Sequence, residues 1–321
     1  MAKHIVVVGS TNLDLVVSAT RNPNIGETLL GSCFEIFTGG KGANQAVAVA
    51  RLGHPVYMIG KLGSDVFSAK MLEDLRSAGV GIQGIGTVPG HSGVALIITA
   101  DSGQNSIIIV PGANDLLFPQ DVEENEALIE NAGVVLTQME TPLTTAEALV
   151  DIASTHRVPL ILDPTPARHL PTRTLRKVAW ITPNETEAQL LSGSTSSPAS
   201  EPELRELAEY FINLGPQNVL LKLGERGAYI ATREGLRASI PAYPVRVADT
   251  TAAGDAFNGA FAVALACGSG PVEAALFASA AAAISVTRRG ALPSMPMRAD
   301  VDSFLAKQAA GLSKDRQESV Q

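Results

Sequence analysis

The sequence has few aromatic residues, few cysteines and no block of basic residues. Aromatic side chains make up 4% of the 321 residues, and the only two cysteines are Cys33 and Cys267. Two cysteines exclude a disulfide framework, and a zinc site is not expected because there is no CxxC pair and the histidines do not cluster. The formal net charge of −8, without any basic run, argues against nucleic acid as a partner.

Long hydrophobic runs are also missing. The apolar run near the N-terminus, Ile5–Val8, is too short for a signal-peptide core or a membrane span. We therefore expect a cytoplasmic protein that does not act at a membrane. Hydrophobic residues make up 45% of the chain and charged residues 17%, which predicts a large folded core. The last residues, 311–321, are polar, and we expect them to form a flexible tail.

Short apolar runs alternate with helical patterns along most of the chain. The runs that we expect to be buried strands are Ile5–Val8, Val56–Ile59, Val134–Thr137, Leu160–Leu162, Trp180–Thr182 and Val219–Leu223. The expected helices between them include Asn44–Leu52, Val66–Ala78, Thr145–Thr155 and Leu204–Leu214. This alternation predicts an α/β fold, a Rossmann-like three-layer α/β/α domain with a mostly parallel central sheet. We expect residues 1–310 to form this single domain.

Two segments, at about 13–39 and 92–112, break the alternation, because they contain strand patterns and turn residues but no helix. In the second segment, the alternating run Val94–Ile98 is followed by a turn and by Ile107–Val110, which is typical of a β-hairpin. We expect these inserted strands to form a small β-sheet lid that projects from the main domain. Ordinary hairpins at the edge of the main sheet are the alternative.

The most informative motif is DTTAAGDAFNG, at Asp249–Gly259. A strand-like segment with Val245 and Val247 precedes it and a long apolar helical run follows, which predicts a strand, a tight turn and a helix with Asp255 in its first turn. The free amides and the dipole of a helix N-terminus form an anion site. Asp255 is then either a helix-capping acid or a base that faces a hydroxyl during phosphorylation. Gly254 favours the second interpretation, because it leaves the backbone open to a ligand.

Other polar residues lie where a ligand could bind. The segment GGKGAN, at Gly39–Asn44, opens a helix but matches neither a Walker A loop nor a complete dinucleotide fingerprint. It is either a site for sugar hydroxyls or a glycine-rich helix start. Asn12 and Asp14 follow the first strand, and Glu140 follows the strand at 134–137. In open α/β sheets, the loops beyond the carboxyl ends of strands hold ligands.

Two further segments each have two interpretations. NETE, at Asn184–Glu187, is either a helix capping box or a set of polar groups that organises Mg²⁺, water and nucleotide phosphate. LGERG, at Leu223–Gly227, is either a turn that contacts a nucleotide or the loop of a hairpin that leads to residues 228–231. The residues alone leave both alternatives open.

In this order, these segments resemble the ribokinase family of sugar kinases. The resemblance extends from Val6 to about Leu305 and rests on GGKGANQA at 39–46 and DTTAAGDAFNG at 249–259. Supporting segments are GSTNLD at 9–14, TPNETEA at 182–188, LGERG at 223–227 and TRRGALPS at 287–294. The resemblance implies ATP-dependent transfer of a phosphoryl group to the 5-hydroxyl of D-ribose, and a homodimer formed through the small sheet.

The resemblance also implies roles for individual residues. Asp255 is implied as the catalytic base, with the backbone amides of Ala252, Ala253 and Gly254 as the anion hole. The implied substrate-binding residues are Asn12, Leu13, Asp14, Gly40, Lys41, Gly42, Ala43, Asn44, Glu140 and Asp255. The implied ATP-binding residues are Asn184, Glu187, Lys222, Leu223, Gly224, Glu225, Arg226, Gly227, Gly254, Asp255 and Ser279. Mg²⁺ accompanies the nucleotide, and an activating K⁺ is implied at Asp249, Thr251, Ser285, Arg288, Gly290 and Ser294, mostly through backbone carbonyls.

Two positions depart from the family pattern. Lys222 stands where ribokinases often carry Thr, and Ser279 stands where a His frequently packs near adenine, so the contacts to the nucleotide base are open. Within the family, the alternatives are kinases of another pentose, a ketohexose or a nucleoside, and the few aromatic residues argue against a nucleoside. A non-catalytic sugar-sensing protein is disfavoured because Asp255 and Gly254 are both present. A dehydrogenase is disfavoured because no intact GxGxxG stands in a βαβ context.

Overall fold

The computed structural model describes residues 3–102, 104–194 and 197–318 of the chain. Its main body contains a nine-stranded sheet in the order β13-β12-β11-β10-β9-β8-β1-β4-β5. The strands are β1 Ile5–Val8, β4 Val56–Gly63, β5 Gly81–Val88, β8 Val134–Thr137, β9 Leu160–Leu162, β10 Trp180–Ile181, β11 Asn218–Lys222, β12 Ala228–Thr232 and β13 Arg237–Ile240. Neighbouring strands from β5 to β11 are parallel, and β12 and β13 are antiparallel additions at one end. The predicted mostly parallel sheet is confirmed.

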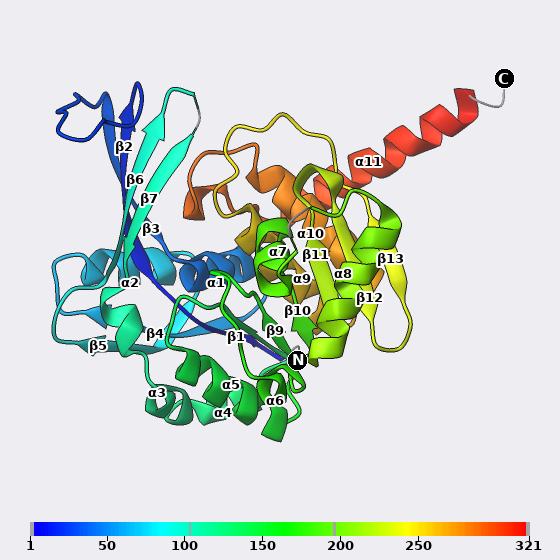
Figure 1. Cartoon of the computed structure of the whole chain (residues 1–321), viewed down its shortest axis with the longest axis horizontal. Helices are drawn as coiled ribbons and strands as arrows, with labels where there is room; N and C mark the ends of the chain where they lie inside the picture. The colour runs from blue at the N-terminus through cyan, green and yellow to red at the C-terminus, as the bar shows by residue number, and fades with distance from the viewer. Residues whose placement is uncertain (1–2, 103, 195–196, 319–321) are drawn as a thin grey trace.

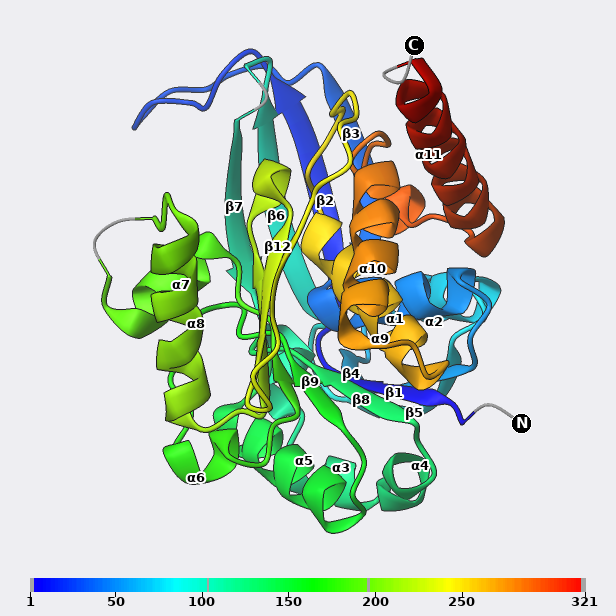
Figure 2. The same ribbon diagram turned by 90° about the vertical axis from the view of Figure 1, so that its right-hand side faces the viewer.

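Helices cover both faces of this sheet, which gives the three predicted layers (Figures 1 and 2). One face is covered by α1 Lys41–Arg51, α2 Ser68–Ser77, α9 Ala253–Ala266, α10 Pro271–Ser285 and α11 Arg298–Glu318. The other face is covered by α3 Pro119–Glu123, α4 Glu126–Glu130, α5 Leu143–Thr155, α6 Thr172–Leu175, α7 Glu185–Ser192 and α8 Glu201–Leu214. In β1, Ile5 and Val7 face the first set of helices and Val6 and Val8 face the second. Because both faces are buried, such strands are apolar at every position.

A second sheet of four strands rises from one end of the main body (Figure 1). Its order is β3-β2-β6-β7, with bounds β2 Asn12–Ala19, β3 Cys33–Gly39, β6 Gly93–Ala100 and β7 Asn105–Val110. The strands β2 and β6 are parallel, and the other pairs are antiparallel. Leu13 is buried against Leu62 and Met71, which attaches the sheet to the main body. The expected small sheet is thus present, and the expected hairpin is β6–β7.

The structure differs from the sequence prediction just before α9. No strand forms at Val245 and Val247, since residues 241–247 are a loop that follows β13. Val247 is 57% exposed, and Pro244 cannot donate a hydrogen bond to a sheet, so the alternating valines do not mark a buried face. The turn that carries Thr250 and Ala252 is therefore entered from a loop.

The C-terminal region is helical further than the sequence suggests. Helix α11 extends away from the main body and includes residues 311–318 of the segment expected as a flexible tail (Figure 1). The remaining tail residues, 319–321, lie outside the described residues. None of the described helices combines the length and hydropathy needed to span a lipid bilayer.

Candidate active site

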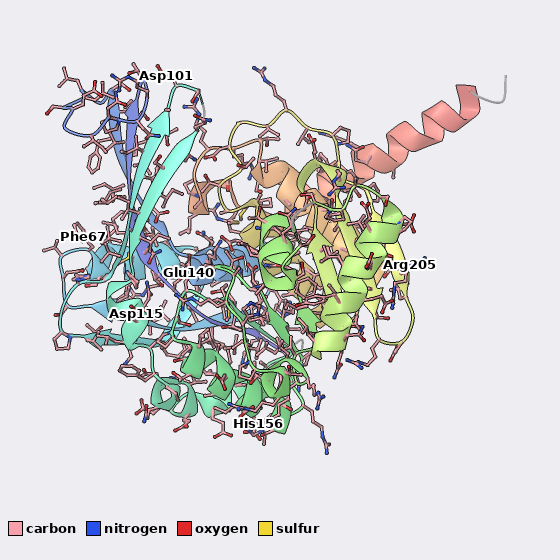
Figure 3. All side chains as sticks on the ribbon, viewed as in Figure 1. Phe67, Asp101, Asp115, Glu140, His156 and Arg205 are labelled. Atoms are coloured by element: carbon pink, nitrogen blue, oxygen red, sulfur yellow. The ribbon has the colours of Figure 1, made fainter. Side chains whose placement is uncertain are left out.

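Polar residues meet at the carboxyl ends of the parallel strands. Strand β1 leads to Ser10 and β8 leads to Glu140, while Asp163 follows β9 and Lys222 ends β11. Because these strands are parallel, the residues that follow them gather at one edge of the sheet. Figure 3 places Glu140 near the base of the small sheet, whose far tip carries Asp101. The candidate site therefore lies between the main sheet and the small sheet.

Asp255 enters this site from the first turn of α9, as predicted, and its residue surface is only 3% exposed. Ala252, which precedes the helix, has a left-handed conformation with φ 59°, which costs about 1 kcal/mol for a residue other than glycine. The N–H of Ala253 donates to the carbonyl of Thr250 at 3.2 Å, so this predicted anion-hole amide has a partner within the turn. The amide of Gly254 belongs to the first helical turn, where no intrahelical acceptor exists.

The carboxylate of Asp255 accepts one hydrogen bond on each oxygen. Asn44 Nδ2 donates to Oδ2 at 2.9 Å, and Gln45 Nε2 donates to Oδ1 at 3.1 Å. Burial raises the pKa of Asp255 to about 6; Lys41 opposes this shift and Asp163 adds to it. The group is therefore mostly ionised at neutral pH, yet its proton affinity is close to that of an effective general base.

Asn12 and Asp14 occupy the start of β2, facing the site from the small sheet. Asn12 Oδ1 accepts a hydrogen bond from Asn114 Nδ2 at 2.8 Å, and Asn114 also bonds the backbone of Thr11. Burial, with the nearby carboxylates of Glu140 and Asp255, raises the pKa of Asp14 to about 7. Gly39 is required beside Asp14, since a Cβ there would lie 2.1 Å from Asp14 Oδ2. The sequence prediction named Asn12 and Asp14 but not Asn114.

Lys41 and Glu140 meet at the start of α1. Glu140 Oε2 accepts hydrogen bonds from the Lys41 amide at 3.2 Å and from Ser10 Oγ at 2.5 Å. Burial alone would lower the pKa of the Lys41 ammonium, but the surrounding carboxylates of Asp255, Asp163, Glu140 and Glu187 raise it above its usual value. Lys41 is therefore a fixed positive charge among several acids.

The other predicted sugar-side residues contribute backbone rather than side chains. Gly40 has φ +87°, and Gly42 lies so close to Ser10 that a Cβ would approach its backbone nitrogen to 2.7 Å. The Ala43 amide donates to the carbonyl of Ser10 at 3.0 Å. The side chain of Leu13 points into the base of the small sheet, away from the site. These contacts hold the first turn of α1 against the end of β1.

Asn184 and Glu187 form the capping box at the start of α7. Glu187 N donates to Asn184 Oδ1 at 2.9 Å, and Asn184 N donates to Glu187 Oε2 at 2.8 Å. Thr165 Oγ1 donates to Glu187 Oε1 and lies 2.9 Å from Asp163 Oδ1. The motif therefore forms the helix capping box, one of its two predicted interpretations. Through Thr165 the box is also linked to Asp163, the acid that follows β9.

Lys222 forms a buried ion pair with Asp163. The Lys222 Nζ lies 3.0 Å from Asp163 Oδ1, and the two side chains are 11% and 2% exposed. Its ammonium is also close to the first turn of α9, because a Cβ built on Gly254 would be 3.5 Å from Nζ. Lys222 therefore brings a positive charge to the predicted anion hole.

The segment Leu223–Gly227 is the loop of the β11–β12 hairpin, one of its two predicted interpretations. Its middle is the short 3₁₀ helix η2, Gly224–Arg226, which includes Glu225. Arg226 pairs with Glu185 of α7, so the loop is tied to the capping-box helix. Ser279 of α10 donates to the carbonyl of Pro241 at 3.2 Å, and Pro241 in turn lies against Gly227 of this loop.

Three of the residues implied for a monovalent cation are joined by hydrogen bonds. Asp249 Oδ1 accepts from the amide and hydroxyl of Thr251, at 2.9 and 2.7 Å, and Oδ2 accepts from the Gly290 amide at 2.9 Å. Burial would raise the pKa of Asp249, but these bonds and Arg289 hold it below its usual value. The side chains of the others point elsewhere: Ser285 and Ser294 bond backbone carbonyls, and Arg288 pairs with Asp300.

Several residues of this site were not identified from the sequence. They are Ser10, Gln45, Asn114, Gln138, Asp163 and Thr165. Asp163 directly follows a predicted strand, which is the same signal that identified Glu140. Gln45 is the residue after the GGKGAN segment, but its contacts depend on α9, more than two hundred positions later.

The family of the chain follows from comparison with known proteins. The model of the pfkB family carbohydrate kinases matches residues 2–298. The chain belongs to the pfkB family of carbohydrate kinases. This family member is 41% identical to the ribokinase of Bacillus subtilis (strain 168) over 306 residues, which are 95% of this chain and 100% of the relative.

A second relative of this pfkB-family chain carries a different substrate in its name. The deoxyribokinase of Salmonella typhimurium is 35% identical over 305 residues, covering 94% of this chain and 98% of the relative. Among solved structures, Arabidopsis thaliana ribokinase complexed with ribose and ATP superposes with a TM-score of 0.89 at 36% identity. That match covers 95% of this chain and 99% of the Arabidopsis chain. The chain is therefore a sugar kinase by family, and its fold matches that of ribokinases.

Proposed function

We propose that this pfkB-family kinase transfers the γ-phosphoryl group of ATP to the 5-hydroxyl of D-ribose, giving ribose 5-phosphate and ADP. One observation carries the proposal. Asp255 is buried, has a pKa of about 6 and lies in the first turn of α9, where it accepts a hydrogen bond from the side-chain amide of Asn44 in the GGKGAN segment. Ribokinases from several organisms are among the full-length relatives of this chain. The position of Asp255 suits a base that accepts a hydroxyl proton beside an anion site.

Several side chains are placed to hold a sugar. Asn44 uses its Nδ2 on Asp255, while its buried Oδ1 has no hydrogen-bond partner among the described residues. An acceptor without a partner is costly to bury, so a donor from a ligand would satisfy it. A sugar hydroxyl supplies such a donor, and Asn12, Asp14, Lys41 and Glu140 would contact the remaining hydroxyls.

The mechanism follows from these positions. Asp255 accepts the proton of the 5-hydroxyl as the hydroxyl oxygen bonds to the transferring phosphorus and the bond to ADP breaks. The amides of Ala252 and Gly254 would donate to the equatorial oxygens, and that of Ala253 would join them on leaving the carbonyl of Thr250; one such donor contributes about 3–4 kcal/mol in other enzymes. Lys222 and Lys41 add positive charge on either side. Closing of the small sheet over the site would exclude water and limit hydrolysis of ATP.

The nucleotide side accommodates ATP with Mg²⁺. Asn184, Glu187 and the turn at 222–227 would contact the nucleotide, with Ser279 on the side of the base. Among the described residues there is no group of three or more acidic, His or Cys side chains placed to hold a metal ion. This suits Mg²⁺, which is held mainly by phosphate oxygens and water, with Glu187 in its outer shell. Mg²⁺ neutralises charge on the phosphates when it is bound.

A monovalent cation and a homodimer complete the proposal. The loops joined through Asp249, Thr251 and Gly290 offer a carboxylate and backbone carbonyls, the oxygen donors that K⁺ takes, at the entrance to the turn before α9. A cation there would hold the turn of the anion hole in place. We place the reaction in the cytoplasm and the dimer contact on the small sheet.

The test is ADP release from Mg-ATP in the presence of K⁺, with ribose, 2-deoxyribose, fructose, adenosine or no sugar. We expect the highest kcat/KM with ribose. In Asp255→Asn we expect kcat to fall by about 10²–10⁴-fold, the usual contribution of a general base, while calorimetry still detects ribose binding. Faster turnover of 2-deoxyribose or fructose would change the assigned substrate and leave the proposed phosphoryl transfer unchanged. Ribose binding without turnover of any acceptor would favour a sugar-sensing protein.

A further inference from the structure

Gln45, in the second turn of α1, is fully buried, and every polar atom of its side chain has a partner. Its Nε2 donates to two different carboxylates, Asp163 Oδ2 at 3.0 Å and Asp255 Oδ1 at 3.1 Å. Its Oε1 accepts from Gln138 Nε2 at 2.7 Å. The three bonds fix both ends of the amide, because only its NH₂ end can face two carboxylates.

Gln45 differs in this respect from its neighbour Asn44. Asn44 also donates to Asp255, but its Oδ1 is left without a partner among the described residues and can accept from a ligand. Both polar atoms of the Gln45 side chain are already bonded to protein groups, and the side chain is fully buried. The two adjacent amides therefore have different roles. Asn44 can contact the sugar, and Gln45 contacts only the protein.

Through Gln45, the base is connected to a second buried acid and its cation. Asp163 accepts from Gln45 on Oδ2 and pairs with Lys222 on Oδ1, at 3.0 Å in both cases. The Lys222 ammonium in turn approaches Gly254, one residue before Asp255. A connected series of contacts, Lys222–Asp163–Gln45–Asp255, therefore lies beside the first turn of α9.

The charges around Asp255 show why such a contact is needed. Two carboxylates in one buried site disfavour each other's ionised form, and Asp163 does raise the pKa of Asp255. The hydrogen bond from Gln45 lowers it. The charged groups that face Asp255 come from five places: Lys41 of α1, Asp14 of β2, Glu140 after β8, Asp163 after β9 and Lys222 of β11.

We propose that Gln45 is a positioning residue for the catalytic base: its amide holds the Asp255 carboxylate toward the acceptor hydroxyl and ties it to the Asp163–Lys222 ion pair. Without this amide, Asn44 is the one hydrogen-bond donor among the described residues left on the Asp255 carboxylate, which then loses a restraint on Oδ1 and a donor that favours its ionised form. The inference rests on the proposed function, because it assigns Gln45 a role for the base of that reaction.

The test compares Gln45→Met with Val49→Ala. Met keeps the length of Gln but removes all three hydrogen bonds, whereas Val49 is a buried residue of the same helix that packs in the apolar core. For Gln45→Met we expect kcat with ribose to fall by about 10-fold or more while the KM for ribose changes by less than about 3-fold. The acidic limb of the plot of log kcat against pH should move up by about 1 unit.

Val49→Ala separates a loss of stability from a loss of positioning. It should lower the melting temperature and leave kcat and the acidic limb unchanged. A milder variant, Gln138→Met, removes only the hydrogen bond that orients the Gln45 amide. It should lower kcat and raise the pH of the acidic limb, both by less than Gln45→Met does. Gln45→Met with the kcat and acidic limb of the unmodified chain would overturn the inference, as would equal effects in Gln45→Met and Val49→Ala.

A second measurement needs no turnover. The pKa of Asp255 can be followed by NMR in protein labelled with aspartate carrying ¹³C at the carboxyl group, with Asp255→Asn used to identify the signal. We expect the pKa to rise in Gln45→Met and to stay in place in Val49→Ala; an unchanged pKa in Gln45→Met would overturn the inference. If the unmodified protein turns over no sugar, the proposed function fails, and this titration still decides whether Gln45 controls Asp255.

Discussion

Asp255 and Asp14 are two acids that one site keeps away from water. Burial is the largest cause of both shifts and raises the pKa values to about 6 and about 7. An acid whose pKa rises on folding favours the folded state least when it is ionised, so each group makes the protein less stable at neutral pH. Such a site is retained for function rather than for stability.

The first prediction is a pH dependence set by Asp255. Its carboxylate must be ionised to accept a proton, so kcat should fall as the pH drops through about 6, by about tenfold per unit below that value. The measurement is log kcat at saturating ribose and Mg-ATP between pH 5 and 9. A kcat that stays level down to pH 5, as for a base with the pKa of an exposed aspartate near 4, would contradict the assignment of Asp255.

The second prediction concerns Asp14→Asn. The folded pKa of about 7 lies above the unfolded value of 3.8, so the contribution of Asp14 to stability is largest below pH 3.8 and is lost as the pH rises toward 7. At pH 7.5, Asn should raise the melting temperature by about 2–4 °C, and the difference should vanish near pH 4. Ribose binding should weaken by about tenfold, as expected for one lost hydrogen bond. A lower melting temperature at pH 7.5 would contradict the prediction.

At the scale of residues, the sequence identifies candidate site residues that come soon after strands. It does not identify the buried side chains that form hydrogen bonds with them. Asn12 and Glu140 were identified because parallel strands deliver such residues to one edge. Asn114 and Gln138 were missed because a buried amide is recognised only by what it bonds, and those bonds depend on how distant segments pack. The charge of Asp255 also depends on its burial, which the motif does not reveal.

At the scale of elements, the close packing of α1 against α9 brings the amides to the base. A Cβ on Gly259 would lie 2.6 Å from Ala48 Cβ and 3.1 Å from the carbonyl of Gln45. Gly42 makes a similarly close approach to the backbone of Ser10. The two glycines hold α1 between α9 and β1, so Asn44 and Gln45 are placed by helix packing.

The third prediction is that Gly259→Ala separates these helices. The added methyl should lower the free energy of unfolding by about 1–3 kcal/mol through overpacking, against a gain of about 1 kcal/mol in helix propensity. It should also lower kcat, because Asn44 and Gln45 move away from Asp255. Chemical denaturation measures the change in the free energy of unfolding, and steady-state kinetics measures the change in kcat.

The control for this prediction is the double variant Gly259→Ala with Ala48→Gly, which restores the space between the helices. We expect it to recover most of the lost kcat, and the double-mutant cycle should show an interaction energy of more than about 0.5 kcal/mol. Additive effects of the two substitutions on the free energy of unfolding would show that there is no steric interaction between positions 259 and 48.

Element prediction from the sequence succeeded where periodicity alone decides. The expected strands at 5–8 and 134–137 coincide with β1 and β8, and each expected helix lies within about three residues of an observed one. It failed at 241–247, where alternating valines are interrupted by proline, and it did not identify β5, whose sequence GIQGIGTV is rich in glycine. Pairing with β4 creates that strand, and tertiary context outweighs local preference there.

At the scale of the molecule, one face of the small sheet carries an apolar row that is partly buried at Leu15 and exposed toward β7. Ile36, Leu15, Leu96 and Ile108 are direct neighbours across β3, β2, β6 and β7. Ile108 is 65% exposed, and all of β7 is exposed. An exposed edge strand and a contiguous apolar face are typical of a protein–protein contact. This is the surface on which we place the dimer.

The fourth prediction tests this contact. Ile108→Glu should convert a dimer into a monomer, because it places a charge on the exposed edge strand at the end of the apolar row. Sedimentation velocity measures the change. Arg205→Glu, on the exposed surface of α8 far from the small sheet (Figure 3), is the matched charge control and should leave the dimer intact. A monomer before any substitution would remove the dimer from the proposal.

The chain order of the proposed ligand contacts has an evolutionary consequence. Apart from Asp255, which faces the reacting hydroxyl, the proposed sugar contacts, Asn12 to Glu140, come from the first half of the chain, and the proposed ATP contacts, Asn184 to Ser279, come from the second. Substitutions that change the acceptor can then accumulate in one half while selection preserves use of the same phosphoryl donor in the other. A deoxyribokinase that aligns along nearly the full length of this chain is the kind of relative that such divergence produces.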